Sequence, residues 1–473
     1  MTKRAQIIRN LKKPNRTWIR PLQEGAGARY QQITQQITEA VRDGVLRPGD
    51  RLPPQRDIAQ TMGVDLTTVT RAYNEVRQQG LLESHGAGGS YIAATGLVGD
   101  QTIDLSMNVP PLLQPAVFAR LLESGMNHLQ THSSQAEWMN YHAGAGLRAD
   151  REAAASWLEP VLGTVSIDRV IICPGAQSAL SAVLLAKTAP GDAVACDSLT
   201  YPGFLGACRV LQRKVMAVSS DHEGMDPDDL ARVCEVAAPA LIYLVPTIHN
   251  PTAVTMSAKR RAAIYAVASR YDVPIVEDDP YWLLAGDAAP PLAALSRPGQ
   301  GAPVYYISTL SKCLTPGLRV AYLVMSAEES MEPVLDALRS ITLMTNQSMV
   351  SMATYWIRTG MAGEMLGKVR QELVQRQKLV AEVLPGIQAH PHGLHIWLTL
   401  PPKLNQYRLI QTALEQGLGV ANSDAFSVNE SAPAAIRVSL GGAPDKGHLK
   451  RALEKLRDIL EADQAGQNRT LVV

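Results

Sequence analysis

Apolar side chains recur at helical spacing near the start of the chain. Residues 30, 33, 37 and 41 are apolar or aromatic, and their spacing predicts a helix over 29–43. A second helix is expected over 55–62, before Gly63, and a third over 66–79, where Asp65 is a suitable N-cap. Two short extended segments, 81–83 and 91–92, flank the glycine-rich turn 85–89 and predict a β-hairpin.

Two short helices joined by a glycine turn, followed by a hairpin, indicate a winged helix-turn-helix. In such a module the third helix enters the DNA major groove by its first turn. Thr67, Thr68 and Arg71 lie on that turn, and side chains of these types reach phosphates and base edges. A three-helix module without a DNA-binding role has the same apolar pattern, so the pattern alone leaves both interpretations open.

From about residue 168, short apolar runs alternate with helical patterns. Helices are expected at about 176–187, 227–235 and 257–270. The expected strands are Val170–Cys173, Val194–Asp197, Leu241–Val245, Ile275–Glu277, Tyr305–Ser308 and Val320–Met325. This alternation predicts an α/β domain with a mostly parallel sheet that is buried on both faces. Ligands of such domains bind beyond the carboxyl ends of the strands.

Four of these strands are followed by polar sequences that could converge on one point. The sequences are PGAQ from 174, PTIHNPT from 246, EDDPY from 277 and TLSKCLTPGLR from 309. The first one opens a helix, and backbone N–H groups at a helix start suit a phosphate. A single lysine or aspartate after a strand is usually a solvated loop residue, but four polar strand ends in this order are not easily explained that way.

Charge is distributed unevenly, although the formal net charge is only +1. Residues 1–95 hold 14 Lys and Arg against 8 Asp and Glu, a balance of +6, and the remainder carries −5. The first 20 residues contain seven basic side chains and no acidic one. The asymmetry favours a polyanion as the partner of the N-terminal module. A solvated basic tail or a transit peptide would also have a basic start.

Length and composition restrict the class of protein. A chain of 473 residues suggests two to four domains, and 46% apolar with 19% charged residues is ordinary for a globular protein. No apolar run reaches the roughly 18 residues of a membrane span, and no signal peptide is expected. The five cysteines form no CxxC pair, which argues against a disulfide framework and against a structural zinc site. These features predict a cytoplasmic protein.

The N-terminal module closely resembles the DNA-binding domain of GntR-type bacterial repressors over about residues 28–95. The strings LRPGDRLPPQR and TTVTRAY carry this resemblance. It implies that the turn Gly86–Gly89 is the wing tip. The implied DNA contacts are Arg47, Arg56, Thr67, Thr68 and Arg71. Many members have Ser-Arg where this chain has Asp65-Leu66, so its base readout is expected to differ.

The body closely resembles the fold-type I pyridoxal-phosphate enzymes of the aspartate aminotransferase class, over about 103–465. The strings HNPT, EDDPY and STLSKCLTPGLR carry this resemblance. It implies that Lys312 forms the Schiff base with pyridoxal 5'-phosphate and that Asp278 faces the pyridine nitrogen. We prefer Asp278 to Asp279 because of its three-residue spacing to Tyr281. Arg437 would bind a substrate α-carboxylate, unless it is a surface ion-pair residue.

The resemblance also implies the other contacts to the cofactor. Asn250 and Tyr281 would hydrogen-bond the ring hydroxyl, and Tyr201 would stack on the ring, unless it is a plain core aromatic. The phosphate would be held by backbone groups of Ala176 and Gln177 and by Thr309, Ser311 and Arg319. Tyr141 would reach the phosphate of a neighbouring chain, which implies a homodimer. His249 is expected to have an indirect packing role, and the sequence shows no partner for His142 or His395.

A GntR-type module joined to an aminotransferase-like body is the layout of the MocR family, which the whole chain resembles. The predicted parts are a basic arm (1–27), the winged helix-turn-helix (28–95), a linker (96–102), the cofactor-binding domain with a smaller C-terminal subdomain (103–465) and a tail (466–473). The resemblance implies a regulator that binds a double-stranded DNA operator, responds to an amino acid or amine by aldimine exchange at Lys312, and forms a domain-swapped head-to-tail homodimer.

Two other functions remain open on the sequence. The chain could be a working aminotransferase with an incidental N-terminal module, because all the catalytic positions are present. It could also sense pyridoxal phosphate itself, with Lys312 only capturing it. Steady turnover of an amino acid would indicate the enzyme, and DNA binding that responds to the cofactor alone would indicate the vitamin sensor.

Overall fold

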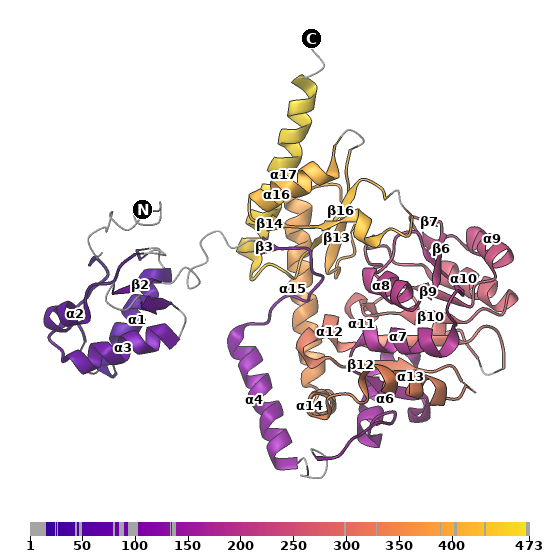
Figure 1. Ribbon diagram of the computed structural model, residues 1–473, viewed down its shortest axis with the longest axis horizontal. Helices are drawn as coiled ribbons and strands as arrows, with labels where there is room; N and C mark the ends of the chain where they lie inside the picture. Colours follow the sequence, from indigo (N-terminus) through magenta and orange to yellow (C-terminus); the bar gives the residue numbers. More distant parts are fainter. Residues whose placement is uncertain are drawn as a thin grey trace, which may run out of the picture. The chain divides into compact units, whose positions relative to one another are not determined.

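The computed structural model divides the chain into two compact units, residues 1–101 and 102–473 (Figure 1). It describes residues 16–23, 25, 27–42, 45–46, 50–78, 81–84, 89–92, 103–132, 134, 139–297, 299–327, 329–387, 389–401, 404–429 and 432–469. Several predicted features lie outside these ranges: Arg47, most of the wing tip, the linker 96–102 and the first 15 residues of the basic arm.

The first unit is a helical module with a two-stranded hairpin. Its elements are α1 (Arg29–Arg42), α2 (Gln55–Met62), α3 (Leu66–Gln78), β1 (Leu82–Ser84) and β2 (Ser90–Ile92). Gly63 ends α2 in the left-handed conformation, at φ 63°, which glycine adopts at little cost. β1 and β2 pair antiparallel, with Leu82 opposite Ile92. The buried stripes of the helices form one apolar core, as the spacing predicts.

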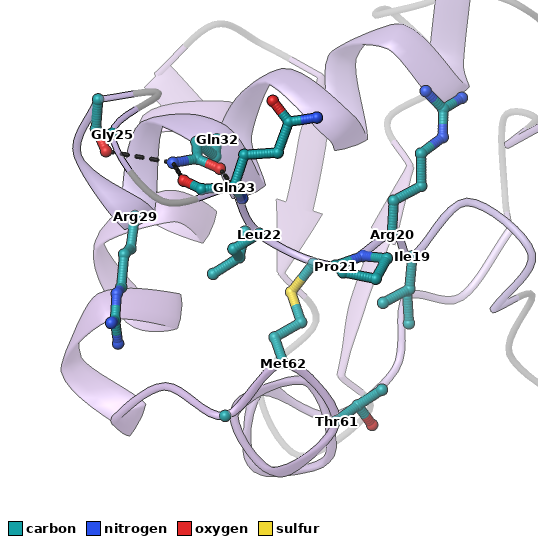
Figure 2. Close-up of a pocket in the computed structure, with 12 residues that line it drawn as sticks. Ile19, Arg20, Pro21, Leu22, Gln23, Gly25, Arg29, Gln32, Thr61 and Met62 are labelled. Atoms are coloured by element: carbon teal, nitrogen blue, oxygen red, sulfur yellow. Dashed lines mark hydrogen bonds between the residues drawn. The ribbon is translucent and has the colours of Figure 1, made fainter.

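Residues 16–23, which precede α1, pack on this module. Trp18 is only 3% exposed and belongs to the core of the module. Gln32 on α1 accepts from the backbone N–H of Gln23 and donates back to its carbonyl, at 2.9 and 3.0 Å (Figure 2). Arg16 pairs with Asp57 of α2 at 2.7 Å. Residues 16–23 of the predicted basic arm therefore pack on the module, because a buried tryptophan fixes this stretch there.

A seven-stranded sheet forms the core of the second unit. Its order is β4 (Val170–Cys173), β12 (Ala321–Val324), β11 (Val304–Thr309), β10 (Ile275–Asp278), β9 (Leu241–Leu244), β5 (Ala193–Asp197) and β6 (Lys214–Val218). Only β12 runs antiparallel to its neighbours in the sheet. The carboxyl ends of β4, β5, β9, β10 and β11 therefore lie along one edge.

Helices cover both faces of this sheet (Figure 1). The helices of this part of the chain are α6 (Arg148–Leu162), α7 (Ala176–Lys187), α8 (Pro202–Val210), α9 (Pro227–Ala237), α10 (Ala258–Arg270), α11 (Trp282–Ala285), α12 (Leu310–Cys313), α13 (Glu332–Thr342) and α14 (Gln347–Arg358). Tyr243 belongs to one apolar cluster, and its neighbours Ile242 and Leu244 belong to another. Successive strand residues thus face opposite layers, which is why the strands are continuously apolar.

A smaller subdomain contains a three-stranded sheet of β13 (His395–Thr399), β16 (Ala435–Ser439) and β15 (Ala421–Asn422). The helices α16 (Gln406–Glu415) and α17 (Lys446–Arg469) complete its apolar core. The long helix α15 (Met361–Val383) runs beside both subdomains, and α4 (Pro115–His132) precedes α6 (Figure 1). β3 (Ile103–Asp104) pairs with β14 (Leu418–Gly419), and β7 (Ser220–Asp221) with β8 (Gly224–Met225).

The predicted fold class is confirmed, and most differences in the elements are of one or two residues at their ends. The helix α17 continues to Arg469 and so includes the first residues of the C-terminal tail predicted from 466. The edge strand β6, whose first residue is exposed, was not predicted from the sequence. No helix in the described part of the chain is long and apolar enough to cross a membrane.

Candidate functional site

Asp278 is the last residue of β10 and lies buried at the carboxyl edge of the sheet. Tyr243 of β9 donates to its Oδ2 at 2.8 Å, and its Oδ1 has no partner among the described residues. Burial raises the pKa of Asp278 to about 6. Both carboxylate oxygens of the neighbouring Asp279 already accept a hydrogen bond, Oδ2 from the Thr247 hydroxyl and Oδ1 from the backbone N–H of Trp282. Of the two carboxylates, Asp278 is thus the one with an oxygen left for a ligand.

Lys312 lies on α12, directly after β11, and its Nζ donates to the backbone carbonyl of Asn108. Burial, together with the positive charges of Arg437 and Arg319, lowers its pKa to about 8, while the Asp278 carboxylate opposes this shift. A lysine with this pKa has roughly two hundredfold more neutral amine near pH 7.5 than an ordinary lysine. The neutral amine is the form that acts as a nucleophile.

Arg437 reaches this group from β16 of the smaller subdomain and is buried, so it is no surface ion-pair residue. Its Nη1 donates to Asn250 Oδ1 at 2.7 Å, its Nη2 donates to the carbonyl of Ser106, and its Nε has no partner in the described chain. The Asn250 carbonyl oxygen is therefore occupied, which leaves its amide nitrogen to donate to a ligand. The unused N–H groups of Arg437 suit a carboxylate.

The turn between β4 and α7 forms a cup for an anion. Gly175 has φ 100° and ψ 160°, a conformation that is essentially restricted to glycine. A Cβ atom there would lie 2.9 Å from Arg319 Cζ, and Arg319 Nη2 lies 3.5 Å from the Pro174 carbonyl. The N–H groups of Ala176 and Gln177 open α7 beside this arginine. Thr309 donates to Ser311 Oγ at 3.1 Å, which leaves the Ser311 hydroxyl proton for a ligand.

Tyr201 and Tyr141 occupy different environments. Tyr201 precedes α8 and is half-buried, and burial and the nearby Asp278 charge raise its pKa. Its side chain packs against the edge of the main apolar core and also lies close enough to Asp278 to be influenced by its charge. Tyr141 is 79% exposed and is not brought to this group within its own chain.

Two residues of the site, Asn108 and Tyr243, were not predicted from the sequence, and the expectation that His395 lacks a partner is wrong. Asn108 Nδ2 donates to the Tyr281 hydroxyl at 2.9 Å and lies 3.0 Å from His395 Nδ1. His395 Nε2 lies 3.0 Å from the carbonyl of His249. Tyr243 could have been found, because it is paired with Val276 in the neighbouring strand and so lies on the same face of the sheet as Asp278, two residues further on. Asn108 and His395 have no such signal in the sequence.

Of the predicted DNA contacts that the structure describes, Thr67, Thr68 and Arg71 lie in the first two turns of α3, and Arg56 lies on α2. Arg56 and Thr67 are exposed, and Thr68 is partly exposed. Asp65 is the expected N-cap: its Oδ1 accepts from the N–H of Thr68 at 3.0 Å, and both threonine hydroxyls donate to its carboxylate. Hydrogen bonds from Thr67 and Thr68 lower the pKa of Asp65 to about 2.

Arg71 is oriented by an aromatic side chain of α1. Its guanidinium lies 3.9 Å from the centre of the Tyr30 ring and donates to the Tyr30 hydroxyl at 3.2 Å. Stacking of this kind restricts the rotamers of the arginine while leaving its outer N–H groups available. The structure thus presents Arg71 in a defined direction at the exposed surface of α3.

Comparison with known families identifies the class of protein. The model for aminotransferase class I and II matches residues 100–456, and the model for bacterial regulatory proteins of the gntR family matches residues 29–92. The chain belongs to the aminotransferase class I and II family and also carries a GntR-type helix-turn-helix. It is a transcriptional regulator of the GntR–aminotransferase fusion type, with the MocR layout.

Individual proteins are similar to most of the chain or to its aminotransferase-like part. The vitamin B6 salvage pathway transcriptional repressor PtsJ of Salmonella typhimurium is 29% identical over 89% of this chain and 96% of its own. The uncharacterized HTH-type transcriptional regulator YdcR of Escherichia coli is 26% identical over 85% and 93%. The kynurenine aminotransferase structure of Pyrococcus horikoshii superposes with a TM-score of 0.69, at 25% identity over 76% of this chain and 91% of that one.

Proposed function

We propose that this regulator binds pyridoxal 5'-phosphate at Lys312 and changes its affinity for an operator when an amino acid or amine replaces Lys312 on the cofactor. The observation that carries the proposal is the unpartnered Oδ1 of Asp278, buried near a lysine whose pKa is lowered. An acceptor of this kind fits the protonated nitrogen of a pyridine ring. The class I aminotransferase fold, which typically binds this cofactor, supports the same assignment.

The residues fit the other parts of the cofactor. Arg319, the N-terminus of α7 and the hydroxyl of Ser311 would hold its phosphate, with Thr309 holding Ser311 in place. The amide nitrogen of Asn250 and the hydroxyl of Tyr281 would bind the ring hydroxyl, and Tyr201 would cover the ring. When bound, the cofactor would supply an aldehyde carbon that joins one amine at a time, either Lys312 Nζ or the amine of an effector.

The remaining groups act on the effector and on the DNA. Arg437 would bind an effector carboxylate through its unused N–H groups. Arg56, Thr67, Thr68 and Arg71 would contact the operator, together with Arg47. An effector can shift DNA binding only if it binds the two arrangements of the protein with different affinity.

We further propose a domain-swapped, head-to-tail homodimer in which Tyr141 of each chain binds the phosphate in its neighbour. The exposure of Tyr141 supports this assignment, since a buried tyrosine would have no reach beyond its own chain. Mixing Lys312→Ala chains with Tyr141→Phe chains should restore one complete site per dimer. Cofactor absorbance in the mixture above the sum of the two separate proteins would support shared sites, and strict additivity would contradict them.

An absorbance screen tests the central assignment. The cofactor-loaded protein is titrated with the twenty standard amino acids and with simple alkylamines, and Lys312→Ala and Lys368→Ala are titrated in parallel. Lys368 is an exposed lysine of α15 and serves as the matched control. We expect the cofactor band of Lys312→Ala to differ from wild type and that of Lys368→Ala to be unchanged.

Operator binding separates this proposal from the other functions. A double-stranded DNA fragment selected from random sequence by the wild-type protein serves as the probe. An affinity that changes with one amine, without turnover, supports the proposal. Steady transamination at ordinary enzyme rates, roughly 1–1,000 per second, would indicate an aminotransferase. A response to the cofactor alone, with no effect of any amine, would indicate a vitamin sensor. An unchanged cofactor band in Lys312→Ala would refute the anchor.

A further inference from the structure

The segment that follows the linker is bonded first to the smaller subdomain. The N–H groups of Ile103 and Leu105 donate to the carbonyls of Gly417 and Gly419, both at 2.8 Å. The N–H of Ser439, at the end of β16, donates to the carbonyl of Leu105 at 2.8 Å. Leu105 is completely buried. These bonds hold residues 103–105 beside the strand that carries Arg437.

Two of the next three residues, Ser106 and Asn108, bond directly to the groups that would bind cofactor and effector. The carbonyl of Ser106 accepts from Arg437, and the carbonyl of Asn108 accepts from Lys312. The side chain of Asn108 donates to Tyr281. The segment 106–108 therefore contacts the proposed effector clamp, the proposed anchor and a ring-hydroxyl ligand, within six residues of the end of the linker at 102.

The orientation of the Asn108 amide follows from its partners. His395 Nε2 faces the carbonyl of His249 at 3.0 Å and must therefore donate its proton. The pKa of His395 is lowered to about 3, mainly by burial, so the ring is neutral and its Nδ1 is an acceptor. Asn108 must then present its NH₂ group to His395, at 3.0 Å, and to Tyr281. Tyr281 accepts that hydrogen bond, which leaves its own proton for a ligand.

This orientation leaves one acceptor unused. Asn108 is only 7% exposed, and its Oδ1 has no partner among the described residues. A buried amide oxygen without a donor is costly, so a ligand that supplies an N–H group would be favoured there. Near Lys312, the available ligand group is the amine of an effector.

We propose that Asn108 is a positioning residue through which the segment 106–108 senses whether an effector has taken the place of Lys312 and transmits this state to the linker. This inference rests on the proposed function. A Lys312 Nζ that is joined to the cofactor cannot hold the same bond to the Asn108 carbonyl as a free amine. A carboxylate on Arg437 competes in the same way with the Ser106 carbonyl. Each ligand state thus sets a different pattern of bonds at 106 and 108.

The variant Asn108→Ala tests this role, with Asn127→Ala, an exposed residue of α4, as the matched control. The measured quantity is the ratio of the operator dissociation constants with and without the amino acid that gives the largest absorbance shift in wild type. For an allosteric protein this ratio is typically about 5 to 150. We expect it to fall towards 1 in Asn108→Ala and to stay at the wild-type value in Asn127→Ala. In Asn127→Ala, DNA affinity without effector should also stay at the wild-type value.

A second readout separates positioning from mere structural support. Loss of the Asn108 donor frees the Tyr281 hydroxyl to rotate, so the midpoint of the pH titration of cofactor absorbance should move by about 0.5–1 pH unit, as expected for one net hydrogen bond. Asn108→Ser, which is smaller but polar, serves if the alanine variant does not fold.

The outcomes distinguish the two proposals. A wild-type protein whose operator affinity responds to no amine would overturn the proposed function, and this inference with it. If wild type responds and the Asn108 variants keep both the full ratio and the same titration midpoint, only the inference is overturned. If the Asn108 variants still bind the cofactor but their ratio of operator dissociation constants falls towards 1, the inference is supported.

Discussion

The glycine between β4 and α7 offers a direct test of the proposed phosphate site, the cup that this turn forms together with Arg319. At Gly175 (φ 100°, ψ 160°) an alanine would be strained, and its Cβ would lie 2.9 Å from Arg319 Cζ and closer still to Nη2. The turn must relax or Arg319 must move, and restoring the cup on binding would cost about 1–3 kcal/mol. Gly175→Ala should therefore weaken binding of pyridoxal phosphate by about 5- to 150-fold.

The assay compares two forms of the ligand. Cofactor-free wild type and Gly175→Ala are titrated by absorbance with pyridoxal phosphate and with pyridoxal, which lacks the phosphate. The affinity for pyridoxal should change less than about twofold, because the strain concerns only the cup. Gly206→Ala is the control, since a Cβ on this residue of α8 would meet no atom within 4 Å. Equal losses for both ligands, or no loss for either, would refute the reasoning.

Three further predictions concern charge and stability. Burial raises the pKa of Asp278 to about 6 in the cofactor-free protein, so the folded state favours the protonated carboxyl. This carboxyl therefore stabilises the fold fully below about pH 4, and the stabilisation is lost as the pH rises through 6. Urea unfolding between pH 4 and 7 should show a weaker pH dependence in Asp278→Asn, and identical slopes would contradict this. Arg261, completely buried, lies 3.7 Å from the buried Glu277; Arg261→Ala should lower the free energy of unfolding by about 3–5 kcal/mol, and a loss below 1 kcal/mol would be evidence against the pair. Arg71→Ala should weaken operator binding by about 1–3 kcal/mol, measured by fluorescence anisotropy, whereas Arg77→Ala, near the other end of α3, should have little effect.

Local patterns in the sequence determined the elements and the families. The helical spacing over 176–187 and the apolar run 170–173 correspond to α7 and β4 without change. Asp65 could be predicted as a cap because a cap depends only on neighbouring residues. The strings HNPT and EDDPY lie at the ends of adjacent strands, β9 and β10, so their convergence follows from a parallel sheet.

Tertiary structure alone decided which atoms of the site are occupied and which remain free. Asn108 contacts Tyr281, Lys312 and His395, which are 173, 204 and 287 residues away in the sequence. These contacts depend on the order of the strands and on the placement of the smaller subdomain. Periodicity reports whether a residue is buried but not which donor faces it. For the same reason the sequence could favour Asp278 over Asp279 only by spacing, whereas the fold occupies Asp279 with Thr247 and backbone donors and leaves one oxygen of Asp278 free.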